Sequence, residues 1–370
     1  MKISYGHQFI APRDIKEVVK ILRSDWLTQG PQIKKFENAL AHYCGAKYAV
    51  VVSSGTAALH LAYLAAGLKK GDEVITTPNT FVATTNMLLA VEVKPVFCDI
   101  RLDTYNIDET KIEKLINKKT KAIVPVHFAG QPCEMEMINQ IAQKNKLLII
   151  EDSCHALGAK YKNSRVGGCK YSDMSVFSFH PVKSITTGEG GAILTNNECY
   201  YKKLLLFRSH GTFKDKNGKN VMVQFGYNYR LTDIQAALGL SQLEKLENFI
   251  KKRCQIVGWY VEGLKDCRDI VLPRELPHNH SSWNLFVIRT TEEKQRDRLS
   301  GYLKKMGIGV NFHYPSVCSH PFYKVHGYGK NNCPMEDEYA LTTITLPLYP
   351  LLSKDEVNHI CRIIKEFYER

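Results

Sequence analysis

One lysine stands between two segments that can hold it out of water. Lys183 follows an apolar run at residues 175–179 and precedes a glycine-rich run at residues 188–191. The apolar run is typical of a buried strand, and the glycines are typical of a turn that re-enters a sheet. A lysine between such segments is partly desolvated, which lowers its pKa and makes its amine a usable nucleophile. The alternative is an ordinary surface lysine.

An aspartate occupies a matching position after another apolar run. Residues 147–150 are apolar and lead through Glu151 into Asp152. Open α/β sheets bind ligands at the carboxyl ends of their strands, although an aspartate there is also a common helix cap. Asp152, Ser178 and Lys183 together form the set that a Schiff-base cofactor requires. The aspartate keeps a pyridine nitrogen protonated, the serine helps to bind a phosphate, and the lysine forms the imine.

A cofactor phosphate needs further donors, and residues 53–58 can supply them. Gly55 permits close approach of the backbone, and free N–H groups at the start of a helix attract an anion. An ordinary capped turn explains this segment equally well. The chain has neither a Gly-x-x-x-x-Gly-Lys loop nor a Gly-x-Gly-x-x-Gly run after a strand, which argues against a nicotinamide enzyme. Phe81 is either a core residue or an aromatic surface for a cofactor ring.

The elements that must position these residues alternate between strand and helix patterns. We expect strands at residues 48–52, 73–77, 95–100, 121–127, 147–150, 174–179 and 192–195, with helices at 56–68, 81–90, 108–117 and 133–146 between the earlier ones. Such alternation predicts an α/β fold with a mostly parallel central sheet and helices on both of its faces.

The remainder of the chain has a different character from about residue 228 onward. Residues 231–252 show one long helical periodicity, followed by a strand pattern at 283–289 and helical patterns at 294–306 and 354–366. A chain of 370 residues exceeds what one compact core usually holds. We therefore expect a large cofactor-binding domain at residues 1–250 and a smaller C-terminal α+β domain at residues 251–370.

Composition excludes several classes of protein. The net charge is +13, but the lysine runs are spread along the chain and form no nucleic-acid motif, so we expect no nucleic-acid partner. The most apolar stretch, residues 49–68, is too polar for a membrane span, and no signal peptide is evident. The eleven cysteines form no Cys-x-x-Cys pair and no zinc pattern. We expect a cytoplasmic protein with reduced thiols, no metal and no membrane contact.

With these residues in place, the sequence resembles the DegT/DnrJ/StrS-type sugar aminotransferase family, which has the fold of the fold type I PLP-dependent transferases. The resemblance covers nearly the whole chain, and it is carried in order by residues 26–31, 54–58, 151–152, 178–191, 208–211 and 226–230. It implies a pyridoxal 5′-phosphate (PLP) cofactor and a mostly parallel sheet with a smaller C-terminal α+β domain.

The resemblance also implies a role for each matching residue. Lys183 would be the Schiff-base lysine and proton shuttle, and Asp152 would pair with the pyridine nitrogen. The remaining cofactor contacts would be His155 near the ring hydroxyl, Phe81 stacked on the ring, and Thr56, Ala57 and Ser178 on the phosphate. Asn228 would reach the phosphate of the neighbouring subunit's cofactor, which implies a homodimer with shared active sites.

Substrate contacts are less sharply defined by the sequence. Arg230 can pair with a carboxylate or a diphosphate, as can Lys34 or Lys35. Thr28, His313 and Tyr314 would face the nucleotide-sugar substrate. For all of these residues, an ordinary surface or packing role is the alternative.

Within the family, the sequence is most similar to the branch that serves pseudaminic acid synthesis. That branch moves an amino group from L-glutamate to C4 of UDP-2-acetamido-2,6-dideoxy-β-L-arabino-hexos-4-ulose. Some family members replace the lysine with histidine and act as dehydratases, so Lys183 favours transamination. The alternatives are another UDP- or dTDP-linked 4-keto sugar, a different PLP reaction such as dehydration or epimerisation, and a binding protein without turnover.

Overall fold

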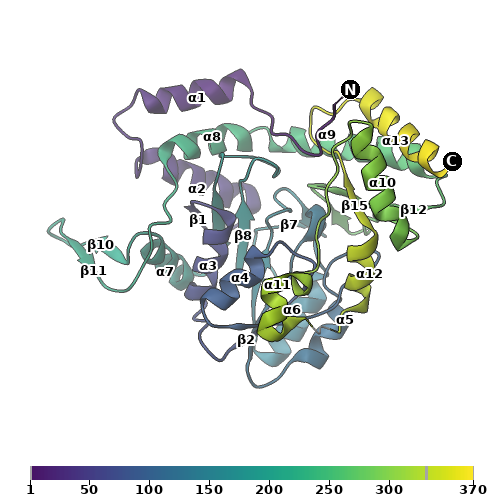
Figure 1. Cartoon of the computed structure of the whole chain (residues 1–370). Coiled ribbons are helices and arrows are strands. Elements are labelled where there is room, and N and C mark those ends of the chain that lie inside the picture. Colours follow the sequence, from purple (N-terminus) through teal and green to yellow (C-terminus); the bar gives the residue numbers. More distant parts are fainter. Residues whose placement is uncertain (1, 330–331, 370) are drawn as a thin grey trace.

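A seven-stranded sheet forms the centre of the molecule in the computed structural model, which describes residues 2–329 and 332–369 (Figure 1). Its strands are ordered β1-β9-β8-β5-β4-β2-β3. Their bounds are Tyr48–Val52 (β1), Glu73–Thr76 (β2), Lys94–Phe97 (β3), Thr120–Val124 (β4), Leu148–Asp152 (β5), Met174–Ser178 (β8) and Gly191–Thr195 (β9). Only β9 runs antiparallel to its neighbours, which confirms the predicted mostly parallel sheet.

Helices cover both faces of this sheet, as predicted. Successive residues of a strand point to opposite faces, so Val50 and Val52 pack with one set of helices while Ala49 and Val51 pack with the other. One face carries α3 (Gly55–Ala65), α4 (Ala83–Ala90) and α7 (Glu198–Arg208). The other carries α2 (Pro31–Cys44), α5 (Glu109–Ile112), α6 (Met135–Asn145) and α8 (Asp233–Leu243).

A second core lies in the C-terminal part of the chain. It is built on an antiparallel sheet of β12 (Ile270–Val271), β14 (Phe286–Thr290) and β15 (Thr343–Leu346). The helices α9 (Leu246–Leu264), α10 (Glu293–Lys305) and α13 (Lys354–Tyr368) pack on it, and α12 (Pro334–Thr342) precedes β15. Ile3 also packs in this core and pairs with Ile308, so the start of the chain joins the C-terminal unit.

The division of the chain at residue 250 stays a prediction. α9 continues through that residue, with Leu246 and Phe249 in the core of the large sheet and Ile256 and Tyr260 in the second core. One helix thus belongs to both units.

The predicted continuous helix at residues 231–252 is wrong, because the chain forms α8 and α9 with a break at Glu244 and Lys245. Asp14, on α1 (Pro12–Leu22), is buried at this break. Its carboxylate accepts hydrogen bonds from Ser241 Oγ at 2.6 Å and Gln242 Nε2 at 2.9 Å, and it pairs with Lys245. This contact joins segments more than 200 residues apart, so helical periodicity alone does not reveal it.

Shorter elements complete the fold. A small sheet contains β13 (Asn279–His280), β6 (Lys160–Tyr161) and β7 (Ser164–Arg165), and α11 spans Pro321–Tyr323. The hairpin of β10 (Thr212–Lys214) and β11 (Asn220–Met222) projects from the body of the molecule near α7 (Figure 1). Among residues 2–329 and 332–369, no helix is long and apolar enough to cross a membrane.

Candidate active site

A cavity of about 660 Å³ lies between the carboxyl ends of the central strands and the C-terminal unit. Eight of the twelve residues predicted for the site line it: Thr56, Phe81, Asp152, His155, Ser178, Lys183, His313 and Tyr314. They come together because parallel strands end at one edge of the sheet and the turns after those ends face the same space.

Asp152 ends β5 and is 5% exposed. Its Oδ2 accepts a hydrogen bond from Thr84 Oγ1 at 2.7 Å, and its Oδ1 accepts one from the N–H of Cys154 at 3.2 Å. Thr84 Oγ1 also lies 2.7 Å from Thr80 Oγ1. Because an ionised carboxylate only accepts, Thr84 donates to Asp152 and the Thr80 hydroxyl donates to Thr84. This chain of donors orients the aspartate.

Thr80 and Thr84 are not among the residues predicted from the sequence. Thr84 lies in the first turn of α4, and Thr80 lies in the bend that precedes the helix. Two threonines four residues apart, directly after a predicted strand end, are the signal that points to them.

Lys183 lies in a tight turn after β8, and its N–H donates to the carbonyl of His180 at 2.9 Å. The turn is fixed further on by Thr186, whose hydroxyl donates to the carbonyl of Phe179 at 3.0 Å. Burial lowers the pKa of Lys183 because it penalises the ammonium form, and the negative charge of Asp152 partly offsets this. The geometry therefore provides a fixed amine that loses its proton more readily than a surface lysine.

The start of α3 is shaped to receive an anion. Ser54 caps the helix, and its Oγ accepts from the N–H of Ala57 at 3.0 Å, while its carbonyl accepts from Ala58. The first N–H groups of a helix have no partner within it, so those of Gly55 and Thr56 are left for a ligand at the cavity wall. The N–H of Ala57 is already used by the cap, and Ala57 does not line the cavity.

Ser178 completes this cradle. A Cβ added at Gly55 would lie 2.9 Å from Ser178 Cβ, so only glycine allows α3 to approach the end of β8 this closely. Ser178 Oγ accepts from the N–H of His180 at 3.4 Å, which leaves its own proton free to donate. Two helix amides and a hydroxyl thus converge, as a phosphate requires.

His155 and Tyr314 form a pair on the opposite wall. His155 Nδ1 accepts from the N–H of Ala129 at 3.3 Å, and its Nε2 lies 3.0 Å from the Tyr314 hydroxyl. Burial, reinforced by the positive charge of Lys183, lowers the pKa of His155 well below its usual value. A neutral imidazole whose Nδ1 accepts must carry its proton on Nε2, so His155 donates to Tyr314. The Tyr314 proton is then free for a ligand.

His313 is also held neutral. Burial, with a smaller contribution from the charge of Lys183, lowers its pKa to about 3. Its Nδ1 lies 2.8 Å from Thr345 Oγ1, and its carbonyl accepts from the Tyr339 hydroxyl at 2.5 Å. The segment that carries His313 and Tyr314 is therefore anchored to β15 and α12.

Phe81 is 57% exposed, although it is a large apolar side chain at the cavity wall. Its ring centroid lies 6.1 Å from that of Tyr314. An exposed ring at this place is available for stacking, and the alternative of a core phenylalanine does not apply. An amine, a buried carboxylate, an anion cradle and an exposed aromatic ring are the groups that PLP needs, so the residues present fit this cofactor.

Three further predicted residues do not line the cavity and lie close to one another. Thr28 is exposed and pairs with Thr232, Asn228 is exposed beside the projecting hairpin, and Arg230 pairs with Val52 at the edge of the sheet. Together with Ala57, they make up the part of the predicted site that this cavity does not include.

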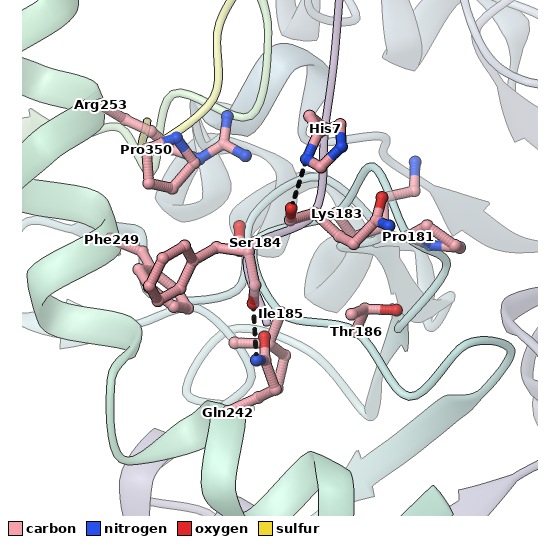
Figure 2. Close-up of a pocket in the computed structure, with 12 residues that line it drawn as sticks. His7, Pro181, Lys183, Ser184, Ile185, Thr186, Gln242, Phe249, Arg253 and Pro350 are labelled. Carbon is pink, nitrogen blue, oxygen red and sulfur yellow. Dashed lines mark hydrogen bonds between the residues drawn. The ribbon is translucent and has the colours of Figure 1, made fainter. Parts of the chain in front are cut away.

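A small pocket lies behind the lysine, on the side of α9. Figure 2 shows it between Phe249 and Arg253 of α9 and the turn from Lys183 to Thr186, with His7 of the N-terminal segment nearby. Gln242 Nε2 donates to the carbonyl of Phe9 at 2.9 Å, which ties the N-terminal segment to α8 at this place. The lysine turn thus faces α9 and the N-terminal segment across this small pocket.

Known proteins are similar to this chain over most of its length. The DegT/DnrJ/EryC1/StrS aminotransferase family matches residues 8–365. A Campylobacter jejuni protein named UDP-4-amino-4,6-dideoxy-N-acetyl-beta-L-altrosamine transaminase is 42% identical over 327 residues, which cover 87% of this chain and 86% of that protein.

Solved structures give the same result. PseC of Helicobacter pylori, an aminotransferase involved in pseudaminic acid biosynthesis, superposes with a TM-score of 0.95 at 36% identity and full coverage of both chains. The PLP-form of Spr1654 from Streptococcus pneumoniae has a TM-score of 0.95 at 32% identity and covers 100% of this chain and 99% of that one. The chain therefore belongs to the DegT/DnrJ/EryC1/StrS aminotransferase family and is a PLP-dependent sugar aminotransferase.

Proposed function

We propose that this protein transfers an amino group from L-glutamate to C4 of UDP-2-acetamido-2,6-dideoxy-β-L-arabino-hexos-4-ulose. The observation that carries the proposal is the placement of Lys183 and Asp152 on one cavity, beside a cradle for a phosphate. The choice of sugar is supported by the similarity to the C. jejuni transaminase and to PseC of H. pylori.

The contacts of the cofactor-binding residues support a role for each. Bound PLP would supply an electron sink for the carbon that loses its proton. Asp152, oriented by Thr84, would hold the ring nitrogen protonated. Gly55, Thr56 and Ser178 would hold the phosphate, and Phe81 would stack on the ring. Together these groups would hold the cofactor in the cavity that Lys183 lines.

Lys183 moves the proton. Its Nζ would take a proton from the substrate carbon and later give it back, which requires an amine that is neutral for part of the time. The lowered pKa of Lys183, caused by burial, provides this. Tyr314, which receives a hydrogen bond from His155, offers its own proton to an oxygen of the substrate, and His313 lies beside it on the sugar side.

We assign three of the remaining predicted residues, Thr28, Asn228 and Arg230, to a homodimer. The projecting hairpin and the residues after it expose large apolar side chains, namely Phe213, Val221, Met222, Val223 and Phe225. Apolar side chains gathered on a projecting arm favour burial against a partner. Asn228 follows this arm directly, with Arg230 and Thr28 beside it. In a dimer, these residues would complete the neighbour's cavity, with Asn228 on the phosphate.

The test is mass spectrometry of the products formed with PLP, L-glutamate and a panel of UDP- and dTDP-linked 4-keto-6-deoxy sugars. We expect amination of the UDP-linked N-acetyl-L-arabino sugar, and no amination by the Lys183→Ala variant. Amination of a different sugar would keep the enzyme class and change the substrate. Loss of water or epimerisation without incorporation of an amino group would favour the alternative PLP reaction. Turnover by Lys183→Ala would refute the central assignment.

A further inference from the structure

One polar side chain at the cavity wall has no partner. Asn284 is 2% exposed and lines the cavity, yet neither its Nδ2 nor its Oδ1 forms a hydrogen bond within the described part of the chain. An amide that is removed from water without a partner is unfavourable, because it loses hydrogen bonds that the unfolded chain makes to water. Because this amide lines a ligand cavity, a bound ligand can supply the missing hydrogen-bond partner.

The backbone around Asn284 is fixed beside His155. The N–H of Ser282 donates to the carbonyl of Gly130 at 3.1 Å, and its hydroxyl donates to the carbonyl of His155 at 2.9 Å. The N–H of Leu285 donates to the carbonyl of Ala129 at 3.3 Å. Ala129 is the same residue that orients the His155 ring. The backbone on both sides of Asn284 is therefore fixed against the segments that carry and orient His155, and the Asn284 side chain lines the same cavity as His155 and Tyr314.

A buried positive charge lies behind this asparagine. Arg253 is 3% exposed, and its Nη1 donates to the carbonyls of Trp283, Asn284 and Leu348 at 3.1–3.2 Å. Burial lowers its pKa to about 10, so it remains charged at neutral pH. Within residues 2–329 and 332–369, it forms no ion pair with a carboxylate. Its charge is thus met by carbonyl groups and by no carboxylate of the described residues, and one of those carbonyls belongs to Asn284.

The other groups on this wall are uncharged. The pKa values of His155 and His313 are lowered by burial, so both rings are neutral. A buried charge favours an anion nearby, because Coulomb interactions are weakly screened away from water. The amino donor carries a carboxylate next to its reacting carbon, whereas the keto carbon of the sugar has no charged neighbour. An anion-selective group at this place therefore distinguishes the donor from the acceptor.

We propose that Asn284 binds the α-carboxylate of the amino donor through Nδ2, with Arg253 as the positioning residue whose charge favours the anion. This inference rests on the proposed function and names a donor-specific contact in the same cavity. It explains why the amide nitrogen of Asn284 is left unpaired in the free protein, and why an arginine without an acidic partner among the described residues lies behind it.

The test uses Asn284→Leu in the PLP-loaded enzyme, with glutarate as an unreactive dicarboxylate probe measured by calorimetry. We expect the variant to bind glutarate at least tenfold more weakly than the wild type. The KM for L-glutamate, measured from the absorbance change as the PLP form is converted, should rise by a similar factor. The KM for the sugar should stay within about twofold. Because the amide has no partner in the free protein, leucine of similar size should leave the melting temperature unchanged or raise it. Asn248→Leu, on the exposed side of α9, is the matched control.

Several results would overturn the inference. Unchanged glutarate binding by Asn284→Leu, or absence of glutarate binding by the wild-type enzyme, would remove the carboxylate contact. A rise in the sugar KM alone would assign Asn284 to the acceptor, and a melting temperature lowered by several degrees would make its role structural. If the wild-type PLP form does not react with L-glutamate at all, the donor in the proposed function is wrong as well. If the wild type and Asn284→Leu react equally well with L-glutamate, only the proposed role of Asn284 is refuted.

Discussion

Replacement of Gly55 by alanine tests whether the start of α3 and the end of β8 form the phosphate cradle. The added Cβ would lie 2.9 Å from Ser178 Cβ and 3.2 Å from Ser178 Oγ. The nearer atom is attached to the backbone of β8 and cannot rotate away. Relief of the contact therefore requires α3 or the strand end to move by several tenths of an ångström, and this movement separates the groups that hold the phosphate.

The effect of Gly55→Ala on the stability of the apoprotein is the sum of two opposing contributions. Forcing an extra methyl group into a packed site costs about 1–3 kcal/mol, whereas alanine in place of glycine gains up to about 1 kcal/mol in a helix. We expect the apoprotein to lose up to about 3 kcal/mol of stability. Weakening one hydrogen bond to a charged phosphate costs about 1.5–3 kcal/mol in affinity, which raises the Kd for PLP roughly 10- to 100-fold.

Titration of the apoprotein with PLP, followed by absorbance, measures this change. The matched control is Gly258→Ala in the middle of α9, where an added Cβ meets no atom within 4 Å. That variant should gain up to about 1 kcal/mol of stability and bind PLP as the wild type does. If Gly55→Ala binds PLP within twofold of the wild type while Gly258→Ala behaves as expected, the phosphate does not lie between α3 and Ser178.

Three further outcomes are expected. Thr84→Val removes the hydroxyl that donates to Asp152, so the Kd for PLP should rise roughly tenfold or more in the same titration; an unchanged value would exclude Thr84 from the site. The pKa of His313 is lowered to about 3 in the folded protein, so the unfolded chain binds more protons there below pH 6.5, and stability falls from pH 6.5 toward pH 3 by about 1.4 kcal/mol per pH unit. His155, whose pKa is also lowered by burial, changes stability in the same direction. Urea unfolding at pH 7 and pH 5 checks this, and His313→Gln should flatten the slope. Phe225→Ser with Met222→Ser should dissociate the proposed dimer in light scattering, whereas a dimer that persists would place the interface elsewhere.

The central sheet is the part of the fold that the sequence predicts well. Each strand of the large sheet lies within three residues of its predicted ends, because a strand covered on both faces is a short, continuous apolar run. Once β5 and β8 are located, the positions of Asp152 and Lys183 at one edge follow from topology. The chemistry of the site is therefore visible in the local sequence around two strand ends.

Local sequence patterns do not predict contacts between residues that lie far apart in the chain. The hydrogen bond from Thr84 to Asp152 spans 68 residues, and the break between α8 and α9 coincides with contacts to Asp14 near the start of the chain. Asn284 left a weak local signal, since it is a polar residue inside the apolar run at residues 283–289. The sequence alone does not show that this residue has a functional contact. The fold provides that information, because it leaves the amide without a partner among the described residues.

Burial raises the pKa values of some groups around the cavity and lowers those of others. The result is that Lys183 is the group suited to move protons. It favours the uncharged form of every group, so it raises the pKa of Tyr314 and lowers the pKa values of His155 and His313. All three shifts lead away from neutral pH and fix these side chains as uncharged hydrogen-bonding groups. The same burial lowers the pKa of Lys183 toward neutral pH. One physical cause therefore leaves the lysine able to exchange its proton, while its tyrosine and histidine neighbours keep theirs in fixed positions.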